Sequence, residues 1–530
     1  MIAPDRETFR SLAREGNLIA LTRRLMSDQL TPVLAYRRLV LPDERTAPSF
    51  LFESVEGGTF IGRYSFLGAQ PIVEVIAEGH EVTIEDHRDD SRTKSHEANP
   101  LSVPARLTQQ WKPVDPAHRR RGGSLPGFTG GWVGYAGYDT VRYLEPEKLA
   151  FEDAPRDDRS LPDMHFGLYR DVVVFDHVSK TLSVVHHVHV DEHISVDAAY
   201  EAGCASLDAF VARVESDAIP LRAGDVDLDL AGRSRAEISS NFKRADFEQA
   251  VRTAKEYIAA GDAFQIVISQ RFERQTSADP FDIYRALRIV NPSPYMIYLQ
   301  ARGSILVASS PEILCRVEDD LVTSRPLAGT RHRGRSEEED AVLEEDLRGS
   351  EKDVAEHVML VDLGRNDLGR VCEIGSINLE RVMDVERYSH VMHLSSTVTG
   401  HLRQGLTAWD ALANTLPVGT VSGAPKVRAM QIIDELEPTR RGPYAGGIGC
   451  VGFTGDMDIA LALRTMVIPT SASSSPAQGW AVHLQAGAGI VADSDPAAEY
   501  EETVNKAAAL ARAIDLAEHT MGESSAKSAQ

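Results

Sequence analysis

The hairpin pattern at residues 171–190, DVVVFDHVSKTLSVVHHVHV, constrains the fold more than any other part of this 530-residue chain. Its second apolar run repeats at a period of two, through Leu182, Val184, Val188 and Val190. Side chains two positions apart lie on the same face of a β-strand, so one face of the hairpin is expected to be buried. SFLFES at 49–54 is predicted as a further strand.

The character of the sequence changes near residue 216. Residues 198–214 are predicted as a helix, after which the chain loses periodicity and gathers Asp, Gly, Ser and Arg. Helix and strand patterns then alternate densely: a helix ends at Gly261, a strand follows in FQIVISQRF, and Asp279-Pro280 begins another helix. The predicted division is an amino-terminal region at 1–215, a linker at 216–240, a second region at 241–518 and a disordered tail at 519–530.

Composition excludes several classes of protein. With 42% hydrophobic and 25% charged residues the chain is typical of globular proteins, and no apolar run approaches the roughly 18 residues that a membrane helix needs. The amino-terminal segment carries charges throughout and lacks the apolar core of a secretory signal, so a cytoplasmic location is expected. A net charge of -23 opposes binding to nucleic acid or to a membrane surface. An anionic substrate would need a local positive site or a metal ion.

The cysteines and histidines do not predict a metal site. Cys204, Cys315, Cys372 and Cys450 are widely spaced without a CxxC pair, so neither a disulfide framework nor a zinc site is expected. None stands in a nucleophile-elbow setting, which predicts that the chain contains no glutamine amidotransferase of its own. Although His187 and His189 share a strand face, nothing nearby supplies a third ligand, and the solvent face of a hairpin is the simpler interpretation.

Two pairs of acidic residues have helical spacing. Asp353 and Glu356 are three residues apart, as are Glu499 and Glu502, so each pair lies on one face of its helix. Two such helices facing each other would suit Mg²⁺, which binds a few carboxylates and keeps water or substrate oxygens in its other positions. Spacing alone favours a simpler interpretation, because Ser350 begins a capping box and acids three apart are common on solvated helices.

Glycine-rich QAGAGIVADSDP, at 485–496, is predicted to run from a strand into a helix that Asp495 caps and Pro496 begins. Backbone N–H groups at Gly487 and Gly489 could cradle a carboxylate. A tight strand-to-helix turn explains the glycines equally simply. His393 lies in an apolar, strand-like context, where a hydrogen-bonded core histidine is the simplest interpretation.

Ten motifs, in order, resemble those of the chorismate-utilising enzymes. They are GDAFQIVISQRF (261–272), NPSPYMIYL (291–299), SSPEIL (309–314), PLAGTRHRG (326–334), EKDVAEHVMLVDLGRNDLGRV (351–371), RYSHVMHL (387–394), PVGTVSGAPKVRAM (417–430), RRGPYAGGIG (440–449), ALALRT (460–465) and QAGAGIVADSDPAAEYEET (485–503). The likeness is dense over roughly residues 240–515 and looser in LFES and GGWVGYAGYD. Within the family, the chain is most similar to the anthranilate synthase branch.

The resemblance implies an α+β fold: a large two-lobed assembly of packed mixed β-sheets surrounded by helices, in which early and late segments interleave. It implies a lyase for the first step of tryptophan biosynthesis, which converts chorismate and ammonia to anthranilate and pyruvate. Region 1–215 would be regulatory and region 241–518 catalytic. Since no glutaminase is expected in the chain, a separate glutamine amidotransferase subunit would deliver the ammonia, making a hetero-oligomer.

The resemblance also implies site residues. Glu356 and Glu502 would ligate Mg²⁺, with Glu499 and Asp353 close by; family members more often have glutamate where Asp353 stands. The implied substrate contacts are Gly329, Thr330, Tyr444, Arg464, Gly487, Ala488 and Gly489. Arg464 suits a bidentate grip on a carboxylate of the chorismate dianion. Ala445 replaces a second glycine beside Tyr444.

The implied catalytic residues are Glu312, His393, Gln265 and Thr330. Glu312 is the candidate general acid for the departing C4 hydroxyl, and its pKa would have to suit that role. His393 matches the residue associated with the elimination of pyruvate. Gln265 stands where the water-adding relatives have a lysine base, and an amide there does not readily activate water.

Tryptophan is implied as a feedback inhibitor. Ser54 in LFES and Pro294, Tyr295 and Met296 in NPSPYM match the tryptophan site of the family, with Phe52 in place of a usual leucine. Binding across segments some 240 residues apart would couple the two regions. Without the family, NPSPYM reads as a proline-fixed turn before a strand.

Two alternatives remain open at this point. Aminodeoxychorismate synthase component I aminates C4 of the same substrate and normally has a lysine where Ala328 stands. A non-catalytic tryptophan-binding protein of the same fold is the other alternative. The acidic set, with Glu312, His393 and Arg464 all present, argues against it.

Overall fold

The structure, a computed structural model, describes residues 1–41, 44, 46–54, 62–114, 127–191, 195–216, 221, 224, 226, 238–388, 391–470 and 479–527, with backbone only for 520–527. Most of the predicted linker at 216–240 lies outside these residues. No helix in the described ranges combines the length and apolar composition that crossing a membrane requires.

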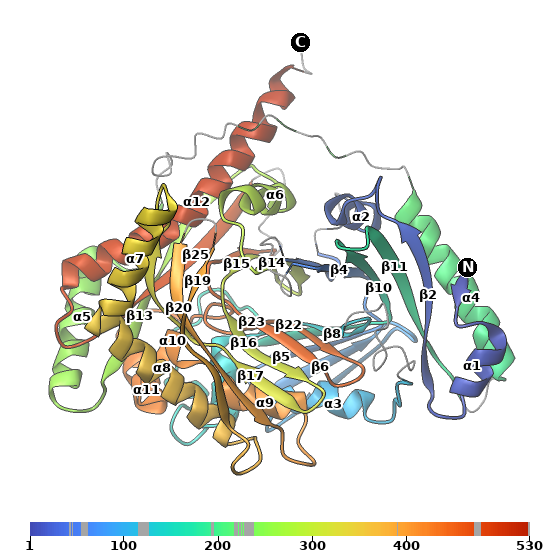
Figure 1. The fold of residues 1–530 in the computed structure, drawn as a ribbon, viewed down its shortest axis with the longest axis horizontal. Helices are drawn as coiled ribbons and strands as arrows, with labels where there is room; N and C mark the ends of the chain where they lie inside the picture. The colour runs from blue at the N-terminus through green and yellow to red at the C-terminus, as the bar shows by residue number, and fades with distance from the viewer. Residues whose placement is uncertain are drawn as a thin grey trace.

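Two large antiparallel sheets form the centre of the protein (Figure 1). The first sheet contains, in spatial order, β1 (Ile2–Ala3), β2 (Leu18–Met26), β11 (Thr181–His189), β10 (Asp171–Asp176), β4 (Tyr64–Ala69), β3 (Ser49–Glu53), β14 (Tyr295–Ala301), β15 (Ser304–Ser310), β24 (Thr465–Pro469), β25 (Trp480–Ile490), β13 (Gln265–Thr276) and β12 (Ser239–Ser240), with β21 (Gly423–Ala424) beside β13. The second contains β18 (Leu327–His332), β20 (Val391–His401), β17 (Leu321–Ser324), β16 (Ile313–Glu318), β23 (Met457–Leu461), β22 (Gly447–Gly452), β8 (Gly131–Ala136), β9 (Met164–Tyr169), β5 (Val73–Glu78), β6 (Glu81–Asp86) and β7 (Ser91–His96), with β19 (Asn378–Arg387) beside β20.

Helices lie on the outer sides of both sheets (Figure 1). They are α1 (Arg6–Leu12), α2 (Pro32–Leu39), α3 (Val103–Thr108), α4 (Val196–Glu215), α5 (Arg244–Ala259), α6 (Pro280–Val290), α7 (Glu337–Gly349), α8 (Glu351–Gly369), α9 (Ala408–Thr415), α10 (Gly419–Ser422), α11 (Lys426–Leu436) and α12 (Pro496–Lys527), with the short 3₁₀ turns η1 (Pro100–Ser102), η2 (Tyr138–Tyr143) and η3 (Phe151–Asp153). This arrangement confirms the expected α+β class. The strand ladders are antiparallel rather than mixed, because many neighbouring strands are joined by short hairpin turns.

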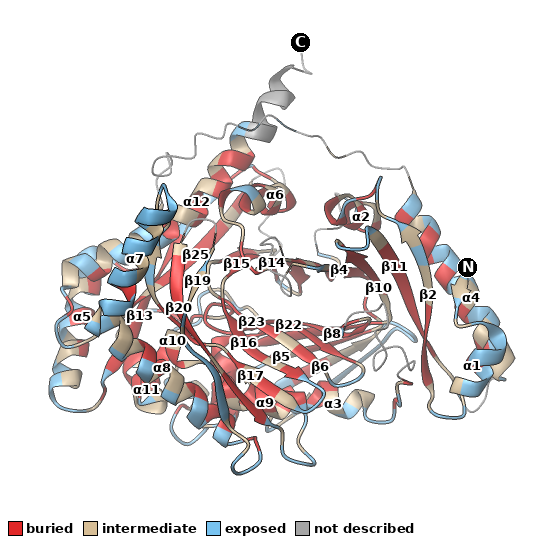
Figure 2. Ribbon diagram, in the orientation of Figure 1, coloured by how far each residue is buried: buried red, intermediate tan, exposed pale blue. Residues whose placement is uncertain are grey.

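Both sheets combine strands from the two sides of the predicted linker. In the first sheet β3 pairs with β14, and in the second β8 pairs with β22. An apolar cluster between the sheets includes Phe50 and Ile297 from the first and Val133 and Ile448 from the second. The division of the sequence into regions stays a prediction. Residues of both regions pack into the same apolar cluster between the sheets, where the strands are largely buried (Figure 2).

Several local predictions are confirmed. β10 and β11 form the antiparallel hairpin at 171–190, and α6 begins at Pro280 with the Asp279 side chain accepting from the backbone of its first turn. α12 continues to Lys527 and so covers most of the segment at 519–530 that was expected to be a disordered tail. Extending an existing helix adds one hydrogen bond per residue, which explains this difference.

The prediction that His187 and His189 lie on a solvent face is wrong for His187, which is buried, whereas His189 is partly exposed. His186 and His187 are both buried, because helix α4 covers one face of the hairpin and the second sheet covers the other. His186 pairs with Asp171 over 2.6 Å, and the His187 ring packs against Phe453. Burial lowers the pKa of His187 to about 4, so this side chain is a neutral core residue.

Candidate active site

Gln265 and Glu356 join strand β13 to helix α8. The Nε2 atom of Gln265 donates to Oε1 of Glu356 over 2.9 Å. Gln265 is buried, and its Oε1 atom has no hydrogen-bond partner among the described residues. α8 begins at Glu351 because Ser350 caps it, accepting from the backbone N–H of Asp353 over 3.3 Å. The capping role expected for Ser350 is therefore confirmed, and the same helix presents Glu356 to β13.

The glycine-rich end of β25 passes directly beside Gln265. A β-carbon at Gly489 would lie 2.5 Å from Nε2 of Gln265, so a larger residue there would force the Gln265 amide to move. β25 then leads into α12, where the Asp495 side chain accepts from the backbone of the first turn and Pro496 is the first residue. The predicted passage from strand to capped helix is confirmed.

The acidic pair of α12 has one buried and one exposed member. Glu499 is 7% exposed, and burial raises its pKa, helped by the neighbouring Glu502 carboxylate. Glu502 accepts from Lys506 over 2.6 Å, and Lys506 also donates to the carbonyl oxygen of Gly487 over 2.9 Å. Lys506 thus ties the acidic face of α12 to the glycine strand.

Glu356, Glu499 and Glu502 stay the predicted Mg²⁺ ligands, and as placed among the described residues their carboxylates do not form a group with all ligand atoms within 4.8 Å of one another. Their hard oxygen donors come from two helices and leave room for water or substrate oxygens. Within the described ranges neither Glu356 nor Glu499 is paired with a cationic side chain, so their charge is available to an ion. Asp353 and Glu502 each pair with a cationic side chain, Asp353 with Arg331 over 3.0 Å and Glu502 with Lys506 over 2.6 Å.

A second acidic cluster does not fit a metal. Ligand atoms of Glu74, Glu85 and His87 lie within 4.8 Å of one another. Arg302, in the turn between β14 and β15, donates to Glu74 over 2.6 Å and to Glu85 over 2.9 Å. A guanidinium group already neutralises this cluster, which therefore joins the two sheets as an ion-pair network.

Glu312 lies between β15 and β16 and is only 4% exposed. Burial raises its pKa to about 8, although a hydrogen bond from Thr420 Oγ1 to Glu312 Oε1, at 2.9 Å, acts in the opposite direction. The carboxyl group is thus largely protonated at neutral pH and able to donate a proton. Thr420 was not singled out from the sequence, although it stands inside the motif at 417–430.

His393, on β20, is held by the strand that faces it. Its Nδ1 atom lies 2.9 Å from the carbonyl oxygen of Gly329 and 3.0 Å from Oγ1 of Thr330. Burial lowers the pKa of His393 to about 4, and the charge of Arg464 also lowers it. With Nδ1–H donating to Gly329, the buried Nε2 atom carries the free lone pair, and it has no partner among the described residues.

Tyr444 and Arg464 lie at the ends of neighbouring turns. Tyr444 is buried, which raises its pKa to about 12, and its hydroxyl group lies against the backbone of Gly487. The backbone of Arg464 has φ of 47°, and its carbonyl oxygen accepts from the N–H of Ser309 over 3.2 Å. Ala445 has φ of 66°, a backbone conformation that favours glycine. Glycine is also the residue that the family resemblance leads us to expect at this position.

Contacts join several of the predicted catalytic, substrate and metal residues to one another. The links are Gln265 to Glu356 and Gly489, Tyr444 to Gly487, Gly329 to Asp353 and His393, and Glu312 to the backbone of Leu327. These residues come from both sheets and from α8 and α12. Their individual roles stay predictions.

The four residues expected to bind tryptophan line one cavity of about 890 Å³. Ser54, Pro294, Tyr295 and Met296 form part of its first-sheet wall, and β16, β22 and β23 of the second sheet form the opposite wall. Two lining residues were missed from the sequence, Arg316 and Asp458. Tyr295 donates to Asp458 over 2.8 Å, and Arg316 pairs with Asp458 over 2.9 Å. The cavity is separate from the site around His393, since none of the catalytic residues lines it.

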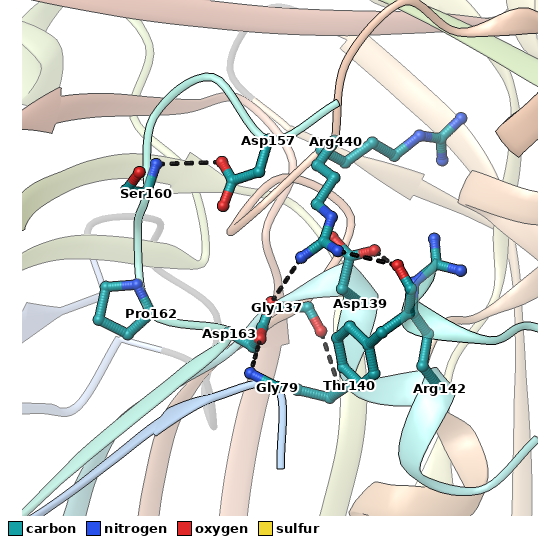
Figure 3. A network of polar contacts seen from close by, with 12 residues as sticks. Gly79, Gly137, Asp139, Thr140, Arg142, Asp157, Ser160, Pro162, Asp163 and Arg440 are labelled. Carbon is teal, nitrogen blue, oxygen red and sulfur yellow. Dashed lines mark hydrogen bonds and ion pairs between the residues drawn. The ribbon is translucent and has the colours of Figure 1, made fainter. Parts of the chain in front are cut away.

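A polar network joins Gly79, Asp163 and Arg440 (Figure 3). Arg440 reaches Asp163 over 4.0 Å, and the backbone N–H of Gly79 donates to the other carboxylate oxygen over 2.7 Å. Burial and the nearby charge of Asp139 raise the pKa of Asp163 to about 7. The network joins the second sheet to the segment leading into the candidate site.

Comparisons with known proteins agree with this geometry. Residues 48–512 match the family model described as chorismate binding enzyme. The chain is 57% identical to anthranilate synthase alpha subunit 1, chloroplastic, of Oryza sativa subsp. indica, covering 98% of this chain and 92% of the relative. It is 45% identical to anthranilate synthase component 1 of Pseudomonas putida, covering 97% and 99%. The crystal structure of anthranilate synthase component I from Streptococcus pneumoniae TIGR4 superimposes with a TM-score of 0.69 at 36% identity, covering 92% of this chain and 99% of that one.

Proposed function

The chain belongs to the chorismate-binding enzyme family, and from this premise we propose that it is the large subunit of an anthranilate synthase. It converts chorismate and ammonia to anthranilate and pyruvate, a lyase reaction that begins tryptophan biosynthesis. The observation that carries the proposal is the 57% identity to an anthranilate synthase subunit over 98% of the chain.

Amination of C2 is favoured by two residues of the site. Ala328 is buried on β18, one residue before Gly329, where the related aminodeoxychorismate synthases have a lysine able to attack C2. Gln265 carries a neutral amide, which donates to Glu356 and does not readily activate water. Both features support attack by ammonia itself.

Glu312 supplies the first proton. Ammonia attacks C2 while the C4 hydroxyl departs, and a protonated carboxyl group lets it leave as water. The raised pKa of Glu312, about 8, supports this role at neutral pH. Thr420 holds the carboxyl group through its hydrogen bond to Oε1.

His393 acts in the second step. Removal of the C2 proton, together with loss of the enolpyruvyl group as pyruvate, makes the ring aromatic. The neutral imidazole has its Nε2 lone pair free for this proton, and the carbonyl oxygen of Gly329 fixes the tautomer through Nδ1. Thr330, beside it, is suited to orient the substrate.

Glu356, Glu499 and Glu502 would hold Mg²⁺, which neutralises substrate carboxylate when it is bound. Arg464 supplies the fixed positive charge for the second carboxylate of chorismate, and the backbone of Gly487–Gly489 supplies N–H donors. These local groups offset the net charge of -23, which repels a dianion at long range.

Tryptophan and a glutaminase subunit complete the proposal. The cavity between the sheets has an apolar wall and buried polar groups, as an indole ring with an amino-acid backbone requires, and Ser54 and Tyr295 are its proposed polar contacts. A separate glutamine amidotransferase supplies ammonia in a hetero-oligomer. The rice relative is named chloroplastic, and the cytoplasmic location expected from the sequence stays a prediction.

The test is anthranilate fluorescence from the purified chain with chorismate, Mg²⁺ and an ammonium salt. No signal with intact chorismate would reject the proposal in favour of a tryptophan-binding protein. Accumulation of aminodeoxychorismate would favour the other aminating enzyme. Ala328→Lys is expected to lower the rate of anthranilate formation. An unchanged rate would show that position 328 does not determine which product is formed.

A further inference from the structure

Arg441 and Glu437 form a buried ion pair directly behind the candidate active site. Their side chains are 1% and 3% exposed. The guanidinium donates twice to the carboxylate, from Nε to Oε2 over 2.9 Å and from Nη2 to Oε1 over 2.6 Å. Removing two charges from water is costly, and such a pair is weak support for stability by itself. Its other contacts indicate what the pair does.

Arg441 also contacts two further segments. One carries Thr420, the hydrogen-bond partner of Glu312, and the other carries Gln265. Nη1 donates to the carbonyl oxygen of Val421 over 2.6 Å, and Val421 directly follows Thr420. Nη2 donates to the carbonyl oxygen of Val267 over 2.7 Å, two residues beyond Gln265 on β13. One planar group therefore fixes the spacing between α10 and β13.

Glu437 connects the pair to the glycine strand. Its Oε1 atom accepts from the backbone N–H of Ser269 over 2.7 Å and from the Ser269 hydroxyl over 2.9 Å. Ser269 stands opposite Gly487 in the β13–β25 ladder, and its Oγ also accepts from Gln485 over 2.9 Å. The carboxylate thus holds β13 where that strand faces the proposed carboxylate cradle.

The guanidinium also lies close to two tyrosine rings. Its central carbon is 4.6 Å from the ring centre of Tyr138 and 5.8 Å from that of Tyr444. Cations within about 6 Å of an aromatic ring attract it. Tyr444, whose hydroxyl lies against Gly487, is therefore anchored from behind by Arg441.

We infer that Arg441 and Glu437 are positioning residues that set the relative placement of Thr420, the Gln265 end of β13, and Tyr444. Neither is proposed to touch the substrate. The inference rests on the proposed function, because it assigns the pair to the geometry of the chorismate site. Lysine cannot replace the arginine, since an ammonium group lacks the planar fork that serves one carboxylate and two carbonyl groups together.

Arg441→Lys is the direct test, with Arg274→Lys as its matched control. Arg274 is an equally buried arginine at the far end of β13, where it pairs with Asp515 and Glu518. We expect Arg441→Lys to lower kcat/KM for anthranilate formation by about 10- to 100-fold through misplaced groups, and the control to change it by less than about threefold. Both are assayed well below their measured unfolding temperatures.

The pH profile distinguishes positioning from general stability. The Thr420 hydrogen bond lowers the pKa of Glu312 within its buried setting. Misplacing Thr420 in Arg441→Lys should therefore move the alkaline limb of the kcat profile to higher pH, whereas Arg274→Lys should leave it in place. If Arg441→Lys does not fold, the same measurements are made on Glu437→Gln, which keeps the side-chain length.

Unchanged kcat/KM and an unchanged alkaline limb in folded Arg441→Lys or Glu437→Gln would overturn the inference, as would an equal loss in Arg274→Lys. A wild-type chain that forms no anthranilate would instead overturn the proposed function. In that case, calorimetry with chorismate tests the positioning role of Arg441 and Glu437. Weaker chorismate binding by Arg441→Lys, but not by Arg274→Lys, would support this role. Equal binding by the two variants, or no binding by any of the chains, would reject it.

Discussion

The Nδ1 atom of His393 lies 2.9 Å from the carbonyl oxygen of Gly329, although 64 residues separate the two in sequence. A carbonyl oxygen only accepts, so Nδ1 carries the proton and Nε2 the lone pair. We expect His393→Ala to lower kcat for anthranilate formation by about 10²- to 10⁴-fold, the usual contribution of a general base. His177→Gln, in the turn after β10, is the control, and anthranilate fluorescence is the measurement. A change of less than about threefold in kcat for His393→Ala would exclude a role in proton transfer.

Glu312 should set the alkaline limit of the reaction. Because burial raises its pKa to about 8, the protonated acid is lost as the pH rises through that value, and kcat should fall with it. Glu312→Gln should reduce kcat by at least about 10²-fold and remove this limb from the residual activity. A wild-type kcat that is flat from pH 7 to pH 10 would contradict the assignment.

The acidic residues of α8 and α12 should differ in their response to Mg²⁺. Glu356→Gln and Glu502→Gln should each abolish anthranilate formation, whereas Asp353→Asn should keep measurable activity because the shorter side chain of Asp353 leaves room for a water molecule between it and the ion. Mg²⁺ binding by calorimetry in the presence of chorismate is the second readout. Glu345→Gln, on the exposed side of α7, should behave like the wild type. Full activity of Glu356→Gln or Glu502→Gln would refute the metal assignment.

The cavity between the sheets should bind tryptophan independently of catalysis. Ser54→Ala should weaken inhibition by tryptophan, since the loss of one hydrogen bond costs about 1 kcal/mol of binding free energy. In the absence of tryptophan, kcat should stay within about twofold of the wild-type value. Inhibition curves and direct calorimetry are the measurements, and Ser95→Ala on the exposed strand β7 is the control. Unchanged inhibition in Ser54→Ala would remove Ser54 from the site.

Asp163 should make the folded chain less stable as the pH rises. Its pKa is raised from about 4 in the unfolded chain to about 7 in the folded chain, so between these values the folded state binds more protons. The stability it contributes is present at low pH and is lost toward pH 7. Asp163→Asn should remove this slope and stabilise the chain at pH 8 by roughly 2 to 4 kcal/mol. Urea unfolding at several pH values measures it, with exposed Asp90→Asn as the control; an identical pH slope in both variants would contradict it.

Local patterns predicted the elements well. The period-two run at 171–190 and the Asp279-Pro280 start of α6 depend on neighbours in sequence, which fix strand faces and helix caps. The histidines of β11 were assigned to solvent because a single hairpin does not reveal that both of its faces will be covered.

The candidate site depended on the resemblance. Glu356 and Gln265 lie 91 residues apart in the sequence, so their contact is not visible locally. From residue spacing alone, Glu356 is best interpreted as an acidic residue on a solvated helix. Local sequence does not indicate roles for Thr420 and Arg441, because the groups to which they donate, on Glu312 and Val267, are distant in sequence. Buried polar groups of this kind become visible only when their partners are known.

The pairing of β3 with β14 and of β8 with β22 limits how such a chain can be cut. A fragment beginning at residue 241 would keep β14 and β22 but lose the strands that cover them, exposing a bare edge on each sheet. Open edges invite pairing with other chains, so this fragment should aggregate rather than work alone. The proposed tryptophan control therefore cannot be removed by deleting the amino-terminal region, because the same deletion would open both sheets; only substitutions within that region would leave the sheets intact.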